Sequence, residues 1–301
     1  MSANNICLPV IQAPMFLLSG PDMVIASCRA GIVGSFPSPN ARTVNILDQW
    51  LQQITSELSE VPHAAPWALN LVMHRSNPRR YDDLELAIKY RAPIVITALG
   101  SPAEAVESVH AYGGKVYADV TTIDFARRAA AVGVDGLALV CCGAGGHTGL
   151  LSPFAFVDEV RQFFDGEIIL SGAISNGRAI RAAEVLGADY VYMGTRFIPT
   201  QESLAQDEYK EMVVEASGAD IVTSDSITGV KANWLKGSLE KVGFDVDNMP
   251  PPGAINFLEA ASDAKRWRDI WAAGQGVGSI DRQQSVAEVV EQLTHEYRSC
   301  L

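Results

Sequence analysis

The sequence predicts a (β/α)8 barrel, or TIM barrel, with a small, mainly helical second domain inserted near the C-terminus. Three observations lead to this α/β fold class. Short apolar runs rich in β-branched residues alternate with longer amphipathic runs, the alternation is repeated eight times, and it stops after residue 218. Strands that alternate with helices indicate βαβ units around a parallel sheet. Eight such units favour a closed barrel.

The expected strands are short apolar segments separated by helix-like or turn-like sequence. They cover residues 9–13, 31–36, 67–72, 93–99, 115–120, 136–141, 167–172 and 190–195. The alternative architecture is an open, doubly wound sheet, which would carry a GxGxxG turn after an early strand. No such turn follows the first or the second strand, so the barrel is preferred.

The expected helices carry recognisable start and stop signals. Proline near the first turn and glycine just after the last turn are typical of helix ends. These signals mark helices within residues 19–31, 101–114 and 175–188, a candidate eighth helix at 201–216, and a final helix at 285–300 that is expected to return to the barrel.

The alternation is absent from residues 218–273. There, "PPPG" at 250–253 precedes a helix-like run that is rich in aromatic residues. We therefore expect residues 1–217 and 274–301 to form the barrel. Residues 218–273 are expected to form a helical insertion that covers the barrel mouth and the substrate.

Composition excludes several kinds of partner. The chain has 301 residues, 48% of them apolar, and a formal net charge of −12, which argues against binding to nucleic acid or to an anionic membrane. Its apolar runs are too short to span a bilayer, and its first residues lack the pattern of a signal peptide. Five cysteines form an odd set without scaffold-like spacing, so a cytoplasmic protein with reduced thiols is expected. No HxH, HExxH or paired CxxC spacing predicts a metal site.

In a (β/α)8 barrel the active site lies at the C-terminal ends of the strands, and a phosphate often binds after strands seven and eight. The sequence places "SGAISNG" (171–177) and "MGTRF" (193–197) at these two ends. Gly172 and Gly194 would let backbone N–H groups approach an anion closely, and Thr195 would add a hydroxyl. The sequence therefore predicts a phosphate site at these two turns.

Other strand ends offer polar or small groups. The first strand runs through Gln12 to Ala13 and Met15, and the small Ala13 leaves room for a flat ring. Asn70 ends the third strand and has both a donor and an acceptor for the edge of a heterocycle. Met15 could equally well pack in the core, without a direct role at the site. Asp119 could equally well cap a helix.

The sixth strand runs into "CCGAGGHTG" (141–149), which carries the best candidate for catalysis. The glycines allow close approach to a ligand, and His147 follows them on the loop. Histidine is the natural general base near neutral pH. Cys141 and Cys142 are expected to fill space in a strand, because a disulfide between neighbours is strained.

Taken together, these segments resemble the nitronate monooxygenase family and its relatives, the flavin-dependent enoyl-thioester reductases and NADH:quinone reductases. The matching segments lie in order along the whole chain. They are "IQAPM" (11–15), "LNL" (69–71), "GAGGHTG" (143–149), "LSGAISNGRAI" (170–180), "MGTRF" (193–197), "TGVKANWL" (228–235) and "AGQGVGSI" (273–280).

The resemblance implies FMN at the barrel mouth, with its phosphate after strands seven and eight. It implies that His147 stands beside the reactive part of the flavin, where it takes a proton from a nitroalkane or steers a nitronate. The cofactor-binding residues that it implies are Ala13, Met15, Asn70, Ala144, Gly145, Gly146, Gly172, Ala173, Gly194, Thr195, Gln275 and Gly276.

The activity implied is oxidation of alkyl nitronates by dioxygen to a carbonyl compound and nitrite. The alternative is an NAD(P)H-dependent FMN reductase that acts on a quinone or an enoyl thioester. A third hypothesis is a barrel that binds a phosphorylated ligand without redox chemistry. Family members often carry an acidic residue where this chain has Gly143, which removes one polar contact. A homodimer is compatible with the sequence, which does not decide the oligomeric state.

Overall fold

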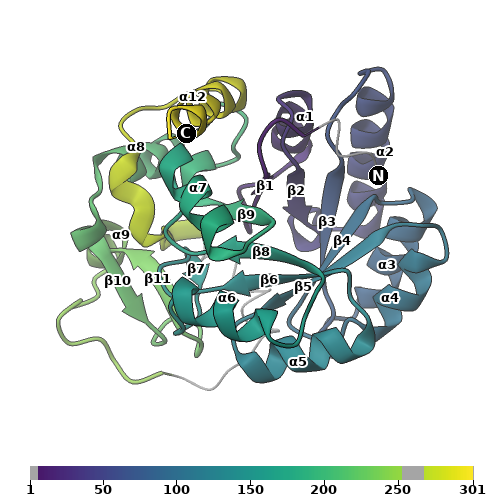
Figure 1. The fold of residues 1–301 in the computed structure, drawn as a ribbon. Coiled ribbons are helices and arrows are strands. Elements are labelled where there is room, and N and C mark those ends of the chain that lie inside the picture. Colours follow the sequence, from purple (N-terminus) through teal and green to yellow (C-terminus); the bar gives the residue numbers. More distant parts are fainter. Residues whose placement is uncertain (1–5, 253–267, 301) are drawn as a thin grey trace.

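The computed structural model describes residues 6–252 and 268–300, and it confirms the predicted barrel (Figure 1). Eight parallel strands are arranged in the order β1-β9-β8-β6-β5-β4-β3-β2. Their bounds are β1 (Val10–Gln12), β2 (Gly34–Pro37), β3 (Trp67–Val72), β4 (Ile94–Ala98), β5 (Lys115–Val120), β6 (Gly136–Val140), β8 (Glu167–Ser171) and β9 (Tyr190–Met193).

The barrel closes between β1 and β2 with the help of one buried side chain. A parallel bridge joins Ile11 to Val33, and the N–H of Val33 donates to the Val10 carbonyl over 3.0 Å. The amide of Gln12 extends this short ladder, because its Oε1 accepts from the Ser35 N–H at 3.0 Å. Gln12 is fully buried and therefore serves the closure of the barrel and not the site.

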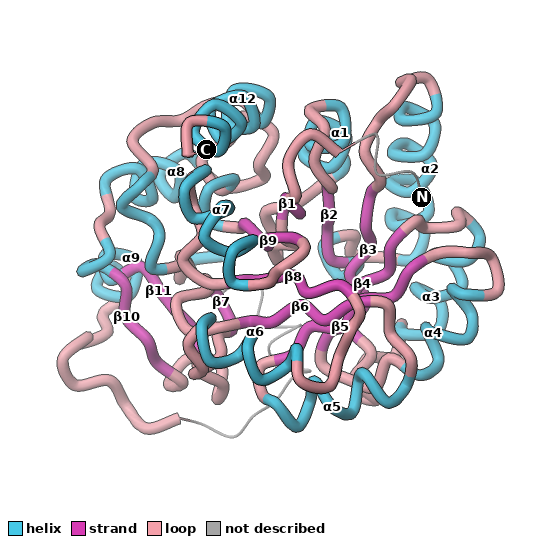
Figure 2. The backbone as a smooth tube through the Cα atoms, in the orientation of Figure 1, coloured by secondary structure: helices cyan, strands magenta, loops and turns pink. Residues whose placement is uncertain are grey.

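Helices surround the barrel (Figure 2). Their bounds are α1 (Pro21–Arg29), α2 (Val44–Ser59), α3 (Arg80–Lys89), α4 (Ala103–His110), α5 (Ile123–Val132), α6 (Pro153–Arg161), α7 (Gly177–Leu186) and α12 (Val286–Arg298). Helix α12 packs against both α7 and α1, so it fills the eighth position of the ring.

The predicted eighth helix, 201–216, appears as α8 (Asp207–Glu215) and lies elsewhere. Its Tyr209 stacks on Trp271 with 5.0 Å between ring centroids and 8° between planes. Its Val213 belongs to the same apolar cluster. Helix α8 therefore packs against Trp271 and its apolar cluster and not in the ring of helices. The sequence could not show this contact, because Trp271 lies far from α8 along the chain.

Helix ends follow the signals that the sequence carries. The hydroxyl of Thr122 accepts from the Phe125 N–H at the start of α5, and Asn176 does the same for Ala179 at the start of α7. Helix α7 ends at Gly187, whose φ of 108° is open to glycine but costly for other residues. Losing one such N-cap typically costs about 1 kcal/mol.

The barrel interior is packed with side chains and is not a pore. Inward-facing residues of successive strands form one apolar cluster. Its members are Ile11, Val33, Ala68, Ile94, Ile96, Tyr117, Ala138, Ile169 and Tyr192. A second, larger cluster fills the space between the strands and the surrounding helices.

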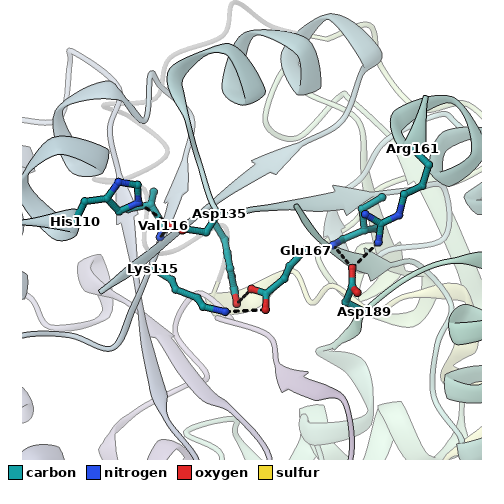
Figure 3. A network of polar contacts seen from close by, with 9 residues as sticks. His110, Lys115, Val116, Asp135, Arg161, Glu167 and Asp189 are labelled. Atoms are coloured by element: carbon teal, nitrogen blue, oxygen red, sulfur yellow. Dashed lines mark hydrogen bonds and ion pairs between the residues drawn. The ribbon is translucent and has the colours of Figure 1, made fainter. Parts of the chain in front are cut away.

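A polar network closes the N-terminal end of the barrel (Figure 3). Asp135 precedes β6 and accepts from the N–H of Val116 at 2.7 Å, and Asp189 precedes β9 and accepts from the N–H of Ile168 at 2.8 Å. Lys115 and Glu167 form an ion pair of 2.7 Å from neighbouring positions on β5 and β8. Each acid therefore ties one strand to another at this end.

A three-stranded antiparallel sheet adjoins the barrel. It contains β10 (Ile221–Ser224), β11 (Ala232–Leu235) and β7 (Gly146–His147), and the short helix α9 (Lys236–Lys241) follows it. The described part of 218–273 is thus built around a strand pair, which the expectation of a mainly helical segment did not include. Runs of four residues are too short for periodicity to identify.

Most of the helix-like run after "PPPG" falls on 253–267, outside the described residues. The domain boundaries at 217/218 and 273/274 stay predictions. In the described part of the chain, no helix is long and apolar enough to cross a membrane.

Candidate functional site

Four segments that are far apart in the sequence meet at the C-terminal end of the barrel. The N–H of Gln275 donates to the Gly143 carbonyl at 2.9 Å, and the N–H of Gly274 donates to Thr195 Oγ1 at 2.8 Å. A Cβ on Gly276 would overlap the hydroxyl of Ser175. The loop after β6, the turns after β8 and β9, and the 274–276 segment therefore form one continuous lining, as the sequence predicted.

The turn after β8 has an unusual backbone. Gly172 has a φ of 128°, and a Cβ there would lie 2.7 Å from the Cys142 carbonyl oxygen. Ala173 follows with a φ of 56°, in the left-handed region that costs a non-glycine residue about 1 kcal/mol or more. Strain of this kind is typical of ligand-binding turns.

The same turns offer hydrogen-bond donors. Outside the β-ladders, the N–H groups of Gly172, Ala173, Gly194 and Thr195 donate to no other group in the part of the chain that the structure describes. The first turn of α7 is less available, because the N–H of Gly177 donates to Glu296 Oε2 at 2.8 Å. An anion at this place would therefore bind the amides of the two turns more than the end of the helix.

Thr195 adds a side-chain donor to this set. Its Oγ1 accepts from Gly274, which leaves the hydroxyl proton free to point at a ligand. The arrangement suits a phosphate group, which accepts several hydrogen bonds at once.

His147 is held by a β-ladder, although the sequence placed it on a loop. It pairs with Ala232, and Gly146 pairs with Asn233, in the register of β7 with β11. The Asn233 amide also donates to the carbonyl of Ala144 at 2.7 Å and is buried. These contacts fix the backbone before and at His147. Asn233 lies in the segment "TGVKANWL", but no pattern in the sequence marks it as a site residue.

Burial also sets the protonation of His147. It lowers the pKa of the imidazole, because the charged form loses hydration. The ring is therefore neutral at neutral pH and can accept a proton or a hydrogen bond. This is the state that a general base requires.

Ala13 and Met15 meet the turn after β9. A Cβ on Gly194 would lie 3.4 Å from Met15 Sδ and 3.6 Å from Ala13 Cβ. Met15 also packs against the apolar clusters of the barrel, so the core-packing alternative holds for it.

Asn70 lies deeper and contacts an acid. Its Nδ2 donates to Asp119 Oδ2 at 3.3 Å, between β3 and β5. Asp119 is not a helix cap, since Thr122 caps α5. Among the described residues, Asp119 Oδ1 and the hydroxyl of Tyr192 are buried without a hydrogen-bond partner. Burial raises the pKa of Asp119 to about 7. The sequence analysis did not single out Tyr192, since an isolated tyrosine in a strand is usually core.

Over residues 6–252 and 268–300 there is no group of three or more His, Cys, Asp or Glu side chains that could hold an ion. Cys141 is buried and Cys142 is exposed, and both are free thiols.

Comparisons with known proteins show the family of this chain. The family model described as nitronate monooxygenase matches residues 59–296. A relative from Mycobacterium tuberculosis is 32% identical over 73% of this chain and 64% of its own length. A carboxyl-CoA dehydrogenase of Rhodococcus jostii is 28% identical over 84% of this chain and 68% of its own length.

Among solved structures, FabK from Thermotoga maritima has a TM-score of 0.82 at 24% identity, and the match covers 98% of this chain and 94% of that one. This likeness supports the barrel fold. The family match covers most of the chain, and enzymes of this family are flavin-dependent oxidoreductases. The chain belongs to the nitronate monooxygenase family.

Proposed function

We propose that the protein is an FMN-dependent monooxygenase that oxidises alkyl nitronates with dioxygen to a carbonyl compound and nitrite. The observation that carries the proposal is His147, a neutral imidazole fixed on β7 two residues after Gly145, which lies against Gly274 and Thr195 of the anion-binding lining. A base next to an anion-binding lining is what deprotonation of a nitroalkane, or capture of its nitronate, requires.

The lining fits FMN. The phosphate would bind the amides of the turns after β8 and β9, namely Gly172, Ala173, Gly194 and Thr195. The ring would lie near Ala13, Met15, Asn70, Ala144, Gly145, Gly146, Gln275 and Gly276. When bound, the cofactor supplies the exchange of electrons with substrate and dioxygen, and the protein supplies position and charge.

His147 would act as the catalytic residue. Its neutral ring would accept the acidic proton of a nitroalkane, and the resulting imidazolium would then hold the anionic nitronate. With a net charge of −12, the protein gives an anionic substrate no long-range attraction, so local donors must retain it.

The direct test uses protein loaded with FMN and an alkyl nitronate, without pyridine nucleotide. We expect oxygen uptake together with nitrite release. Protein that binds FMN but consumes no oxygen with several alkyl nitronates would contradict the proposal.

A second candidate is an FMN enzyme that acts on a thioester, with NAD(P)H as donor if it works as a reductase. The similarity to a carboxyl-CoA dehydrogenase favours it. Anaerobic mixing of the loaded protein with NADH or NADPH separates the two candidates. Rapid bleaching of the flavin would favour a reductase, and a stable flavin spectrum would favour the monooxygenase.

A further inference from the structure

Asp119 is a partly buried acid whose Oδ1 is enclosed, and no part of the proposed reaction uses it. It lies near the C-terminal end of β5, where it pairs with Ala138 of β6. Its Oδ2 receives one long hydrogen bond from Asn70 Nδ2, at 3.3 Å. Its Oδ1 has no partner among the described residues.

Among the described residues, no positive charge lies close enough to Asp119 to lower its pKa, and only the hydrogen bond from Asn70 does so. The strand register places Asp119 opposite the apolar Ala138 of β6, and Ala138 lies opposite the apolar Ile169 of β8. The titratable group that interacts electrostatically with Asp119 is Tyr192 on β9. The negative charge of Asp119 helps to raise the pKa of that phenol. Tyr192 therefore stays neutral and supplies no positive charge.

The two oxygens of Asp119 consequently have different roles. Oδ2 accepts from Asn70, so a proton on the carboxyl belongs on Oδ1. In this neutral form Asp119 is compatible with its apolar surroundings, whereas the ionised form would be buried with a single weak hydrogen bond. Burial accordingly raises the pKa of Asp119 to about 7.

We propose that Asp119 holds a proton beneath the flavin-binding face of the barrel, and that binding of FMN is coupled to uptake of this proton. The neutral carboxyl of Asp119 fixes the amide of Asn70. Asp119 is thus a positioning residue, which acts through Asn70. The inference rests on the proposed function in one respect, namely that the flavin ring covers Asn70.

The coupling has a simple physical origin. A ring over Asn70 removes solvent that still reaches Asp119, and this further disfavours the ionised form. Near pH 7 part of the population is ionised before binding, so formation of the complex must take up a fraction of a proton. The uptake should be largest above pH 7, between the pKa of Asp119 without FMN and the higher pKa with FMN bound, and small at pH 5, where Asp119 is already neutral.

The test is titration of the apoprotein with FMN by calorimetry, in two buffers of different ionisation enthalpy. The FMN phosphate contributes its own proton exchange, so the informative quantity is the difference between wild type and Asp119→Asn. We expect wild type to take up as much as about half a proton more than the variant at pH 7. Equal proton uptake would overturn the coupling.

A matched control is Glu167→Gln, which removes an acid at the opposite end of the same barrel, where Lys115 neutralises it. It should match wild type in proton uptake, and a loss equal to that of Asp119→Asn would overturn the assignment to Asp119.

Infrared spectra of the apoprotein test the proton itself, without any cofactor. Wild type at pH 6 should show the C=O band of a protonated carboxylic acid, which is absent from Asp119→Asn. Absence of the band in wild type would overturn the inference even if FMN binds. Failure of wild type to bind FMN would instead overturn the proposed function, and the coupling with it.

Discussion

The two ends of the barrel differ in how their polar groups are satisfied. At the N-terminal end, Asp135 and Asp189 each accept from the first backbone amides of a neighbouring strand, and Glu167 pairs with Lys115 (Figure 3). At the C-terminal end, Asp119 Oδ1 and the Tyr192 hydroxyl have no partner among the described residues.

The backbone shows the same contrast. The strained turn of Gly172 and Ala173 lies at the C-terminal end, where free amides also gather. Polar groups without partners and strained turns reduce stability and persist where a ligand can use them. We infer that the N-terminal end maintains the fold, whereas the C-terminal end is suited to bind a ligand.

The largest effect is expected for His147→Ala. Loss of a positioned base typically reduces turnover by about 10² to 10⁴-fold. The variant should still bind FMN, since the phosphate donors belong to other turns. Turnover is measured as nitronate-dependent oxygen uptake.

The control for that variant is His295→Ala, on the exposed surface of α12, and its turnover should equal that of wild type. Unchanged turnover in His147→Ala would remove His147 from the mechanism.

The pH dependence of the free energy of unfolding should reveal the raised pKa of Asp119. Its pKa is raised from 3.8 to about 7 on folding, so the folded protein holds this proton more tightly. The stabilisation is complete below about pH 4 and is lost as the pH rises through about 7, with a loss of as much as about 3 kcal/mol between pH 5 and pH 8. Urea unfolding of wild type and Asp119→Asn from pH 5 to 8 measures it. A difference between the two proteins that does not change with pH would contradict the assignment.

A substitution at the N-terminal end of the barrel should change the stability of the protein but not its affinity for FMN. Asp189→Ala leaves the N–H of Ile168 without its acceptor and removes one of the acceptors of Arg161, so the free energy of unfolding should fall by about 2 kcal/mol. The affinity for FMN should not change. Asp281→Ala, at an exposed acid, is the matched control and should stay within about 0.5 kcal/mol of wild type. A large loss of FMN affinity in Asp189→Ala would contradict the inference that the N-terminal end affects only stability.

The smallest effect is expected for Ala173→Gly. Glycine adopts the φ of 56° without strain, but it also makes the unfolded chain more flexible. The free energy of unfolding should therefore rise by less than about 1 kcal/mol. Thermal unfolding with and without FMN measures it, and a marked fall in stability would show that Ala173 is not strained.

The sequence predicts the parts of the molecule whose signals are local. Alternating apolar runs revealed the strands, and the glycines of "SGAISNG" and "MGTRF" marked the turns that carry free amides. The predicted β6 loop, turns and 274–276 segment do come together, because the barrel topology brings the C-terminal strand ends to one face.

Other features depend on contacts between distant segments and have no local signal. The pairing of β7 with β11 joins His147 to Ala232, and α12 occupies the ring position that 201–216 was expected to fill. The contact of Asn70 with Asp119 crosses the barrel interior, and only the packed structure shows that one carboxyl oxygen remains without a partner.

The most direct test of the central claim compares the affinities of the purified apoprotein for FMN and for riboflavin, which lacks the phosphate. Quenching of flavin fluorescence measures both. If the amides of Gly172, Ala173, Gly194 and Thr195 bind the phosphate, two or more charged hydrogen bonds should make FMN bind at least about 100-fold more tightly. Equal affinities, or no binding of FMN, would contradict the account of the C-terminal end.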